Sequence, residues 1–356
     1  MFLKGAHVVD QSNVISKKGK PQLLSKRAWF LVPMAIILCV VFVLSLCLGR
    51  YHALPHEVVS VLFGHALGNP SDAALDNVIF SVRMPRIVMA MLVGAALSQA
   101  GAAYQAVFSN PLVSSDILGV SSGASFGAAL GILFSGTALA VEGLALLFGL
   151  IAVGLVILLG RVRRKTQLYM LVLAGVIVSS LFAAMVSLIK YVSDPYDQLP
   201  AITTWLMGSL SSSSYAGVQL TCAVVIPCSL LLWALRWKLN LLSLDEEEAA
   251  SLGIDVSKMR IFTLLIATFM TVVTVSLCGV VGWIGLVIPH IGRMIVGNDH
   301  RLLVPATLLL GASYLLLIDD VARSVTSSEI PLSILTAVIG APFFAWILRR
   351  TKGCAQ

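Results

Sequence analysis

Few residues in this chain have the types and the spacing that covalent chemistry requires. The segment 119–123, Gly-Val-Ser-Ser-Gly, matches the G-x-S-x-G pattern of a serine nucleophile, with His290 as the candidate base. That pattern needs a sharp turn between a strand and a helix, whereas this segment is apolar and helical in composition. Glycines recur every four residues here, so close helix packing is the favoured interpretation, at Gly119, Gly123, Gly127 and Gly131. We expect no catalytic residue, and an intramembrane serine hydrolase is the alternative.

Metal-ligating residues are equally sparse. His52, His56 and His65 could indicate a metal site, but Pro55 separates His52 from the helix expected to begin there, which spoils the spacing of ligands on one helix face. Surface histidines are the better interpretation, and we expect no metal site. The six cysteines form no C-x-x-C pair, and all but Cys354 lie in apolar runs, so they are expected to be small buried residues without disulfides.

The composition indicates an integral membrane protein. Hydrophobic residues make up 58% of the 356 residues, charged residues 12%, and the mean hydropathy is +0.95, whereas a soluble domain has about 25% charged residues. Apolar runs long enough to cross a hydrocarbon core of about 30 Å recur along the chain. The sequence predicts an all-α protein with ten transmembrane helices, the eighth short and broken by Pro289, at residues 29–48, 87–107, 117–134, 141–160, 168–189, 216–235, 261–280, 284–296, 302–318 and 330–348.

The basic residues set the expected orientation. With an inner N-terminus, 19 of the 24 Lys and Arg residues fall in inner segments and 5 in outer ones, as the positive-inside rule requires. Both termini are then cytoplasmic, and the pI near 9.2 reflects topology and not nucleic-acid binding. The expected organisation is a polar N-terminal tail at 1–27, a membrane domain at 28–350, and a C-terminal tail at 351–356.

Two polar segments of the membrane domain are expected to lie outside the bilayer. The outer segment at 49–85 contains a short amphipathic helix that begins at Pro55 and is expected to lie along the outer membrane face. The cytoplasmic loop at 237–258 contains the acidic run 245–248, followed by an apolar turn that ends at Gly253. A short helix with one apolar side is better suited to docking than to solvation alone.

The source of energy for any transport is expected to lie outside this chain. The sequence has no G-x-x-x-x-G-K-[ST] loop for ATP. The interiors of the predicted spans carry almost no ionisable side chain, whereas ion-coupled carriers keep such groups at mid-depth. A secondary carrier is therefore disfavoured but stays an alternative, and another polypeptide is expected to act on the acidic run.

Arginines gather at the outer ends of two predicted spans, on the side where basic residues are scarce. Arg83 and Arg86 precede the second span, and Arg323 follows the ninth. Two interpretations are open. The guanidinium groups either snorkel toward phospholipid phosphates, or they form a socket for carboxylates of an external protein.

Six segments together carry a resemblance to a known family. They are Arg-Met-Pro-Arg at 83–86, Val-Gly-Ala-Ala-Leu at 93–97, Ser-Asn-Pro-Leu at 109–112, Leu-Gly-Val-Ser-Ser-Gly-Ala at 118–124, Gly-Trp-Ile-Gly-Leu-Val-Ile-Pro-His-Ile-Gly-Arg at 282–293, and Gly-Ala-Pro-Phe-Phe at 340–344. In this order they resemble the FecCD family of permeases, the membrane subunits of ABC importers for iron-siderophores, haem and cobalamin. The match runs from about residue 29 to 350.

The resemblance implies a division of labour among several partners. A periplasmic substrate-binding protein would dock at Arg83, Arg86 and Arg323. A cytoplasmic ABC ATPase dimer would bind ATP and Mg, so this chain itself would carry no cofactor. Contact with the ATPase would use the acidic loop, where Glu247 and Glu248 look less typical and the best-matching residues are Glu246, Ala249, Leu252 and Gly253.

The resemblance also implies where the cargo passes. Two permease copies would pair around a central path in the inner membrane, as a homodimer or as a heterodimer with a similar permease. An inner gate is expected at Thr166, Gln167, Leu168 and Tyr169. The outer segment 191–214 would form a half-helix beside the mouth, bracketed by Pro195 and Pro200. An iron-siderophore is the first expectation for the cargo, and haem, cobalamin or an oxyanion are the alternatives.

Overall fold

The computed structural model describes residues 27–49, 51, 53–67, 72–162, 165–166, 168–242, 255–326 and 328–352, which are almost entirely helical. A two-residue antiparallel hairpin, β1 (Arg161–Val162) with β2 (Lys165–Thr166), is the exception. The helices are α2 (Leu31–Cys47), α3 (Pro55–Ala66), α4 (Ala73–Asn77), α5 (Met84–Val107), α6 (Val120–Phe134), α7 (Ala138–Gly160), α8 (Leu168–Val192), α9 (Gln198–Leu206), α10 (Tyr215–Leu241), α12 (Val256–Cys278), α13 (Ile284–Val296), α14 (His300–Ser324) and α15 (Leu332–Lys352).

Each of the ten predicted apolar segments overlaps one of these helices, although four of them (29–48, 117–134, 261–280 and 330–348) extend a few residues beyond the helix. Within the described residues, six helical stretches are long and apolar enough to cross a membrane: Ala73–Val107, which contains α5, and the helices α7, α8, α10, α12 and α14. The remaining four predicted segments correspond to shorter apolar helices, α2, α6, α13 and the apolar part of α15. The prediction of an all-helical membrane protein is therefore confirmed.

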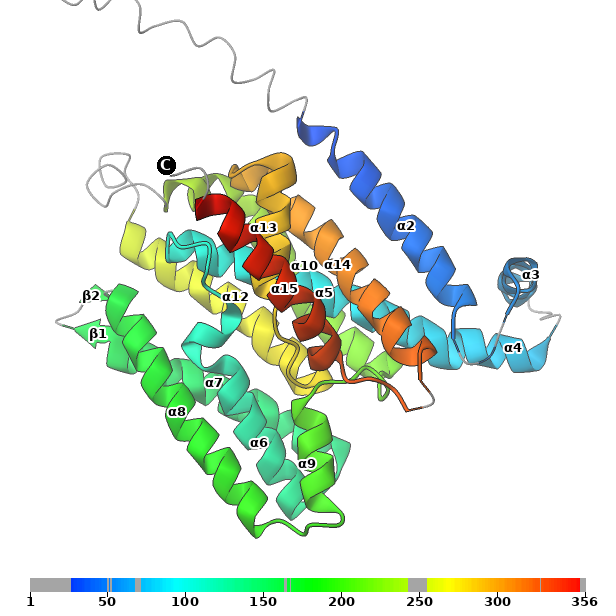
Figure 1. The fold of residues 1–356 in the computed structure, drawn as a ribbon, viewed down its shortest axis with the longest axis horizontal. Helices are drawn as coiled ribbons and strands as arrows, with labels where there is room; N and C mark the ends of the chain where they lie inside the picture. The colour runs from blue at the N-terminus through cyan, green and yellow to red at the C-terminus, as the bar shows by residue number, and fades with distance from the viewer. Residues whose placement is uncertain are drawn as a thin grey trace, which may run out of the picture.

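Helix α5 lies at the centre of the fold and contacts α10, α12, α13 and α14 (Figure 1). Most of its residues are buried, and small residues let its neighbours approach closely. A Cβ atom on Gly94 would lie 2.2 Å from the carbonyl oxygen of Gly311 in α14, and one on Gly101 would lie 2.0 Å from that of Gly285 in α13. Ser98 adds a hydrogen bond of 2.7 Å to the carbonyl of Thr307. The centre therefore depends on backbone contact between helices.

The predicted break at Pro289 is wrong, because α13 continues through this residue to Val296. A proline in a helix leaves the carbonyl four residues earlier without its usual donor. Here that carbonyl belongs to Gly285, and the Gln105 side chain of α5 donates to it at 3.3 Å. A hydrogen bond from the neighbouring helix therefore replaces the missing one, and the helix is not interrupted.

Three of the four predicted packing glycines face α7. Cβ atoms on Gly123 and Gly127 would lie 2.5 and 2.0 Å from carbonyl oxygens of α7, and one on Gly131 would lie 2.6 Å from the Cα atom of Val141. Gly119 differs, because it precedes α6 with a φ of 70° and lies against Ser179 of α8. In Figure 1, α6, α7, α8 and α9 form a group of their own beside the helices around α5.

Two short helices flank the long ones. Helix α3 begins at Pro55 as predicted, and the Glu57 carboxylate accepts a hydrogen bond of 2.8 Å from the backbone N–H of Leu54. Helix α9 lies within the predicted half-helix segment, but Pro200 lies in its first turn and does not bound it. The first turn tolerates proline because its N–H groups have no partner inside the helix.

The end of the bundle where α10 ends and α14 begins has its own polar anchor. Asp299 accepts hydrogen bonds from the Arg301 side chain and, at 2.8 Å, from Asn240 at the end of α10. Burial opposes the charge of Asp299, but these hydrogen bonds prevail and lower its pKa to about 2. The carboxylate is therefore charged at neutral pH and holds α10 to α14. We call this end of the bundle, where Asn240, Asp299 and Arg301 meet, the basic end.

Candidate functional site

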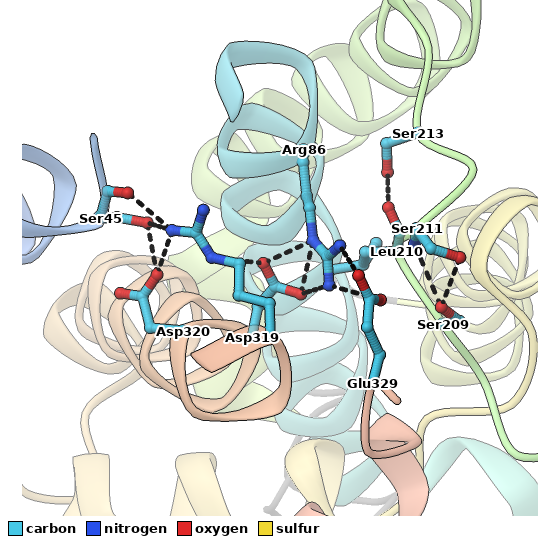
Figure 2. A network of polar contacts seen from close by, with 10 residues as sticks. Ser45, Arg86, Ser209, Leu210, Ser211, Ser213, Asp319, Asp320 and Glu329 are labelled. Atoms are coloured by element: carbon cyan, nitrogen blue, oxygen red, sulfur yellow. Dashed lines mark hydrogen bonds and ion pairs between the residues drawn. The ribbon is translucent and has the colours of Figure 1, made fainter. Parts of the chain in front are cut away.

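The three arginines of the predicted socket come together at the opposite end of the bundle, the arginine end. Arg83 ends the π-helix η2 (Val78–Arg83), which continues directly into α5, and Arg86 lies in the first turn of α5. Arg323 lies in the last turn of α14. The arginine cluster consists of these residues and three carboxylates beside them, Asp319, Asp320 and Glu329. Figure 2 shows Arg86 with the three carboxylates.

Arg86 is bound by two carboxylates at once. Its Nε atom lies 3.1 and 3.0 Å from the two oxygens of Asp319, and its Nη2 atom lies 2.8 Å from one of them. Its Nη1 and Nη2 atoms also donate to Glu329, at 2.8 and 3.0 Å. Arg86 is 8% exposed and Asp319 0%, so this pair is desolvated and depends on its own hydrogen bonds for stability.

Arg323 joins α14 to α2. Its Nη2 atom donates to Asp320 at 2.5 Å and to both the carbonyl and hydroxyl oxygens of Ser45, at 2.6 and 2.7 Å. The Ser45 hydroxyl in turn donates to Asp320 at 2.6 Å. These buried hydrogen bonds fix the end of α2 against α14, because breaking them would leave further buried polar atoms without a partner.

Arg83 holds together the turn of the chain that follows α2. Its two terminal nitrogens donate to the backbone carbonyls of Leu46 and Tyr51. Gly49 lies directly over the guanidinium group, where a Cβ atom would be 3.0 Å from Nη2, and its φ of 144° favours glycine. Arg83 therefore holds a turn of its own chain.

The arginines are thus engaged within the protein. Three arginines meet three carboxylates, so the formal charge of the arginine cluster is zero. A cavity of about 280 Å³ adjoins the cluster and is lined by Gly49, Tyr51, Val78, Val82, Arg83, Arg86, Arg323 and Glu329. Arg83 and Arg323 are 4% and 6% exposed. Snorkelling of extended side chains into lipid headgroups does not describe this arrangement.

Sequence reasoning places the three carboxylates near the ends of spans but gives them no role in the socket. Asp320 and Asp319 precede Arg323 by three and four residues on one helix, a spacing at which opposite charges meet, and this was the available signal. Glu329 gave no such signal, because it lies in the connection between α14 and α15 and reaches Arg86 across 243 residues of sequence.

The connection that carries Glu329 is tied to α9. After Glu329 the chain enters α15, and the backbone N–H groups of Leu332 and Ser333 donate to the carbonyls of Gly208 and Met207, both at 3.1 Å. Ser209 follows Gly208 in the chain, and its backbone N–H group donates to the carbonyl of Cys278 at the end of α12, at 2.8 Å. Backbone hydrogen bonds therefore link the arginine cluster to the ends of α9 and α12.

A second cavity lies beside this linked region. Its volume is about 760 Å³, and it lies between α6, α7, α9, α12 and the segment that follows α9. Hydroxyl groups dominate its polar lining, together with the Glu142 carboxylate: Thr204, Ser209, Ser211, Ser212, Ser214 and Ser276. Such hydroxyls donate and accept hydrogen bonds without bringing a charge.

The remaining predicted site residues are only partly described. In the predicted gate, Thr166 belongs to β2, and Leu168 and Tyr169 begin α8, where Tyr169 is 64% exposed. Gln167 lies outside the described residues. The four predicted coupling residues, Glu246, Ala249, Leu252 and Gly253, also lie outside them.

The residues of the hydrolase alternative have other contacts. The Ser121 hydroxyl donates to Asp116 at 2.5 Å. The His290 ring contacts Phe344 edge to face, with ring centroids 6.3 Å apart. Within the described part of the chain, no hydrogen bond joins the serine to the histidine. Ser121 also lies in the first turn of α6, without the strand that a nucleophile elbow needs.

The fold and the arginine cluster define a polytopic helical membrane protein whose ionic groups gather at the helix ends. Residues 37–350 match the model of the FecCD transport family. The chain therefore belongs to the FecCD transport family, as its sequence motifs indicated.

Individual relatives match along nearly the whole chain. The molybdate import system permease protein MolB of Haemophilus influenzae is 41% identical over 319 residues, which cover 90% of this chain and 95% of that protein. An iron chelatin transport system permease protein described for Helicobacter pylori is 40% identical over 300 residues, 83% of this chain and 90% of that one. A solved ABC transporter assigned to the metal-chelate type, in an inward-facing conformation, matches with a TM-score of 0.82 and 41% identity, over 90% of this chain and 99% of that one.

Proposed function

We propose that this chain is the permease subunit of a binding-protein-dependent ABC importer and that two copies enclose the path of the cargo. The family match over residues 37–350 carries this proposal. The match covers 95% of the molybdate import system permease protein and 90% of the iron chelatin transport system permease protein. The chain performs no covalent chemistry, and a cytoplasmic ATPase dimer supplies the energy by binding ATP and Mg.

The orientation follows from the distribution of charge. The arginine end faces outward and the basic end faces the cytoplasm of the cell, with the protein in the inner membrane. The substrate-binding protein docks at the arginine end through Arg83, Arg86 and Arg323. The acidic loop, with Glu246, Ala249, Leu252 and Gly253, contacts the ATPase on the inner side.

The path begins beside the hydroxyl-lined cavity and ends at the gate formed by residues 166–169. Hydroxyl groups suit a cargo rich in oxygen atoms, a property that ferric chelates and oxyanions share. An iron-siderophore is the first candidate for the cargo. Molybdate is the second, because a molybdate import permease is 41% identical to this chain.

Transport by the reconstituted importer tests this proposal. The permease, its ATPase and its binding protein are placed in liposomes, and uptake of a radiolabelled ferric siderophore or molybdate is measured with and without ATP. We expect uptake that requires both partners and ATP. Uptake under an ion gradient by the permease without its partners would instead support a secondary carrier. Uptake of molybdate but not of the ferric siderophore would make molybdate the cargo.

A further inference from the structure

We propose that Glu329 is an internal substitute for a carboxylate of the docking protein. In the resting permease it occupies Arg86, and an acidic side chain of the partner displaces it. Displacement releases the connection between α14 and α15 and, through it, the end of α9. This inference rests on the proposed function, because it concerns how the docking site works.

The two carboxylates on Arg86 are not equivalent. Asp319 has a side chain that is 0% exposed and also lies 3.8 Å from Nε of Arg323, so it is part of the buried interior of the cluster. Glu329 comes from a connection, lines the cavity and has a side chain that is 26% exposed. Of the two, Glu329 is the one that can leave Arg86 for water without exposing the interior.

The charges favour an acidic side chain as the replacement. With Glu329 in place the cluster is neutral, and without it the three arginines face two aspartates, which leaves one net positive charge beside the cavity. The Nη atoms of Arg86 that Glu329 now occupies at 2.8 and 3.0 Å would then bind another carboxylate in the same two-pronged geometry. A partner carboxylate therefore restores both the charge balance and the hydrogen bonds.

Release of Glu329 from Arg86 would change the contacts at the ends of α9 and α12. Only two residues separate Glu329 from Leu332, whose N–H group donates to the carbonyl of Gly208 at the end of α9. Ser209 beside it is bonded to Cys278 at the end of α12 and lines the hydroxyl-lined cavity. A shift of the connection thus reaches the proposed mouth of the path through backbone hydrogen bonds. The contacts that run from Glu329 through Leu332 and Gly208 to Ser209 therefore link docking of the binding protein to opening of the path.

Glu329→Gln tests the proposal, because it removes the charge and keeps a side chain of the same size. Asp197→Asn is the matched control: it also removes one negative charge beside α9, and Asp197 is exposed and caps α9 without a side-chain hydrogen bond. The permease with its ATPase is held in nanodiscs. Affinity for the binding protein is measured by surface plasmon resonance, and ATP turnover is measured with and without the binding protein.

We expect Glu329→Gln to bind the binding protein about two- to fivefold more tightly than the control variant does. ATP turnover without the binding protein should rise, and its stimulation by the binding protein should fall, because the connection is already released. Thermal melting of both variants shows whether each one is folded. If Glu329→Gln is unstable, Glu329→Asp, which keeps the charge but shortens the reach to Arg86, is expected to give the same changes.

Two results would overturn the proposal. Binding and turnover equal to those of Asp197→Asn would show that Glu329 does not compete for Arg86. Weaker binding by a folded Glu329→Gln would show that Glu329 itself supports docking. In both cases the native permease still responds to the binding protein, so the proposed function stands. If the native permease does not bind it at all, the proposed function and this inference fail together.

Discussion

Asp319 is the residue on which the arginine cluster most depends. Its carboxylate is fully buried and accepts three hydrogen-bond contacts from Arg86 within 3.1 Å. A buried pair of this kind gains little over an apolar pair, but removing one partner leaves the other charge desolvated and alone. The arginine cluster is therefore needed for the folded state whether or not a partner is bound.

We expect Asp319→Asn to lower the free energy of unfolding by about 3–5 kcal/mol. The melting temperature of the purified protein in detergent, followed by intrinsic fluorescence, measures the loss. Asp197→Asn removes a charge from an exposed position and should melt like the native protein. Equal melting of the two variants would mean that Arg86 finds sufficient compensation from Glu329 alone.

At the scale of the element, close helix contact depends on glycine at particular positions. Gly127 has the carbonyl oxygen of Leu144 where its Cβ atom would be, at 2.0 Å, whereas Gly143 on the neighbouring helix has nothing within 4 Å. The two residues therefore separate packing from the general helix propensity of glycine and alanine.

Gly127→Ala should force α6 and α7 apart and cost about 1–3 kcal/mol, because backbone atoms cannot yield as a flexible side chain can. Gly143→Ala should leave stability unchanged or raise it slightly, since alanine is the better helix former. Chemical denaturation of both variants in the same detergent provides the comparison. A similar denaturation midpoint for the Gly127→Ala and Gly143→Ala variants would show that α6 and α7 can move apart without loss of stability.

At the scale of the whole molecule, the orientation in the membrane assigns each end its partner. Tyr196, in the connection between α8 and α9, is 91% exposed and marks the arginine end. Lys258 has a side chain that is 87% exposed, and it lies in the first turn of α12 at the basic end. The two positions report the two sides of the membrane.

In a variant whose six cysteines are replaced by alanine, we expect Tyr196→Cys to react with a membrane-impermeant maleimide added outside intact spheroplasts. Lys258→Cys should react only after the membrane is opened, because the excess of Lys and Arg keeps its end inside. Gel-shift labelling distinguishes the two. The reverse pattern would invert the proposed sites of the ATPase and of the binding protein.

Residue patterns along the chain were sufficient to predict the class of the protein, the approximate positions of its long helices and its family. Hydrophobic runs and the distribution of Lys and Arg can be read locally along the chain. Each apolar segment in a membrane must pair its backbone N–H and C=O groups within its own helix. The six motifs in their order indicated the family, although the helix break expected at Pro289 did not occur. The donor that prevents the break, Gln105, comes from another helix.

The contacts of the three arginines depend on the tertiary fold. From the sequence, Arg83, Arg86 and Arg323 were cations at an outer surface, free for lipid or for a partner. In the fold each is buried and hydrogen-bonded, and the carboxylate that covers Arg86 comes from a connection 243 residues away. Burial and pairing depend on which segments meet in space, and no local pattern records the approach of Glu329 to Arg86.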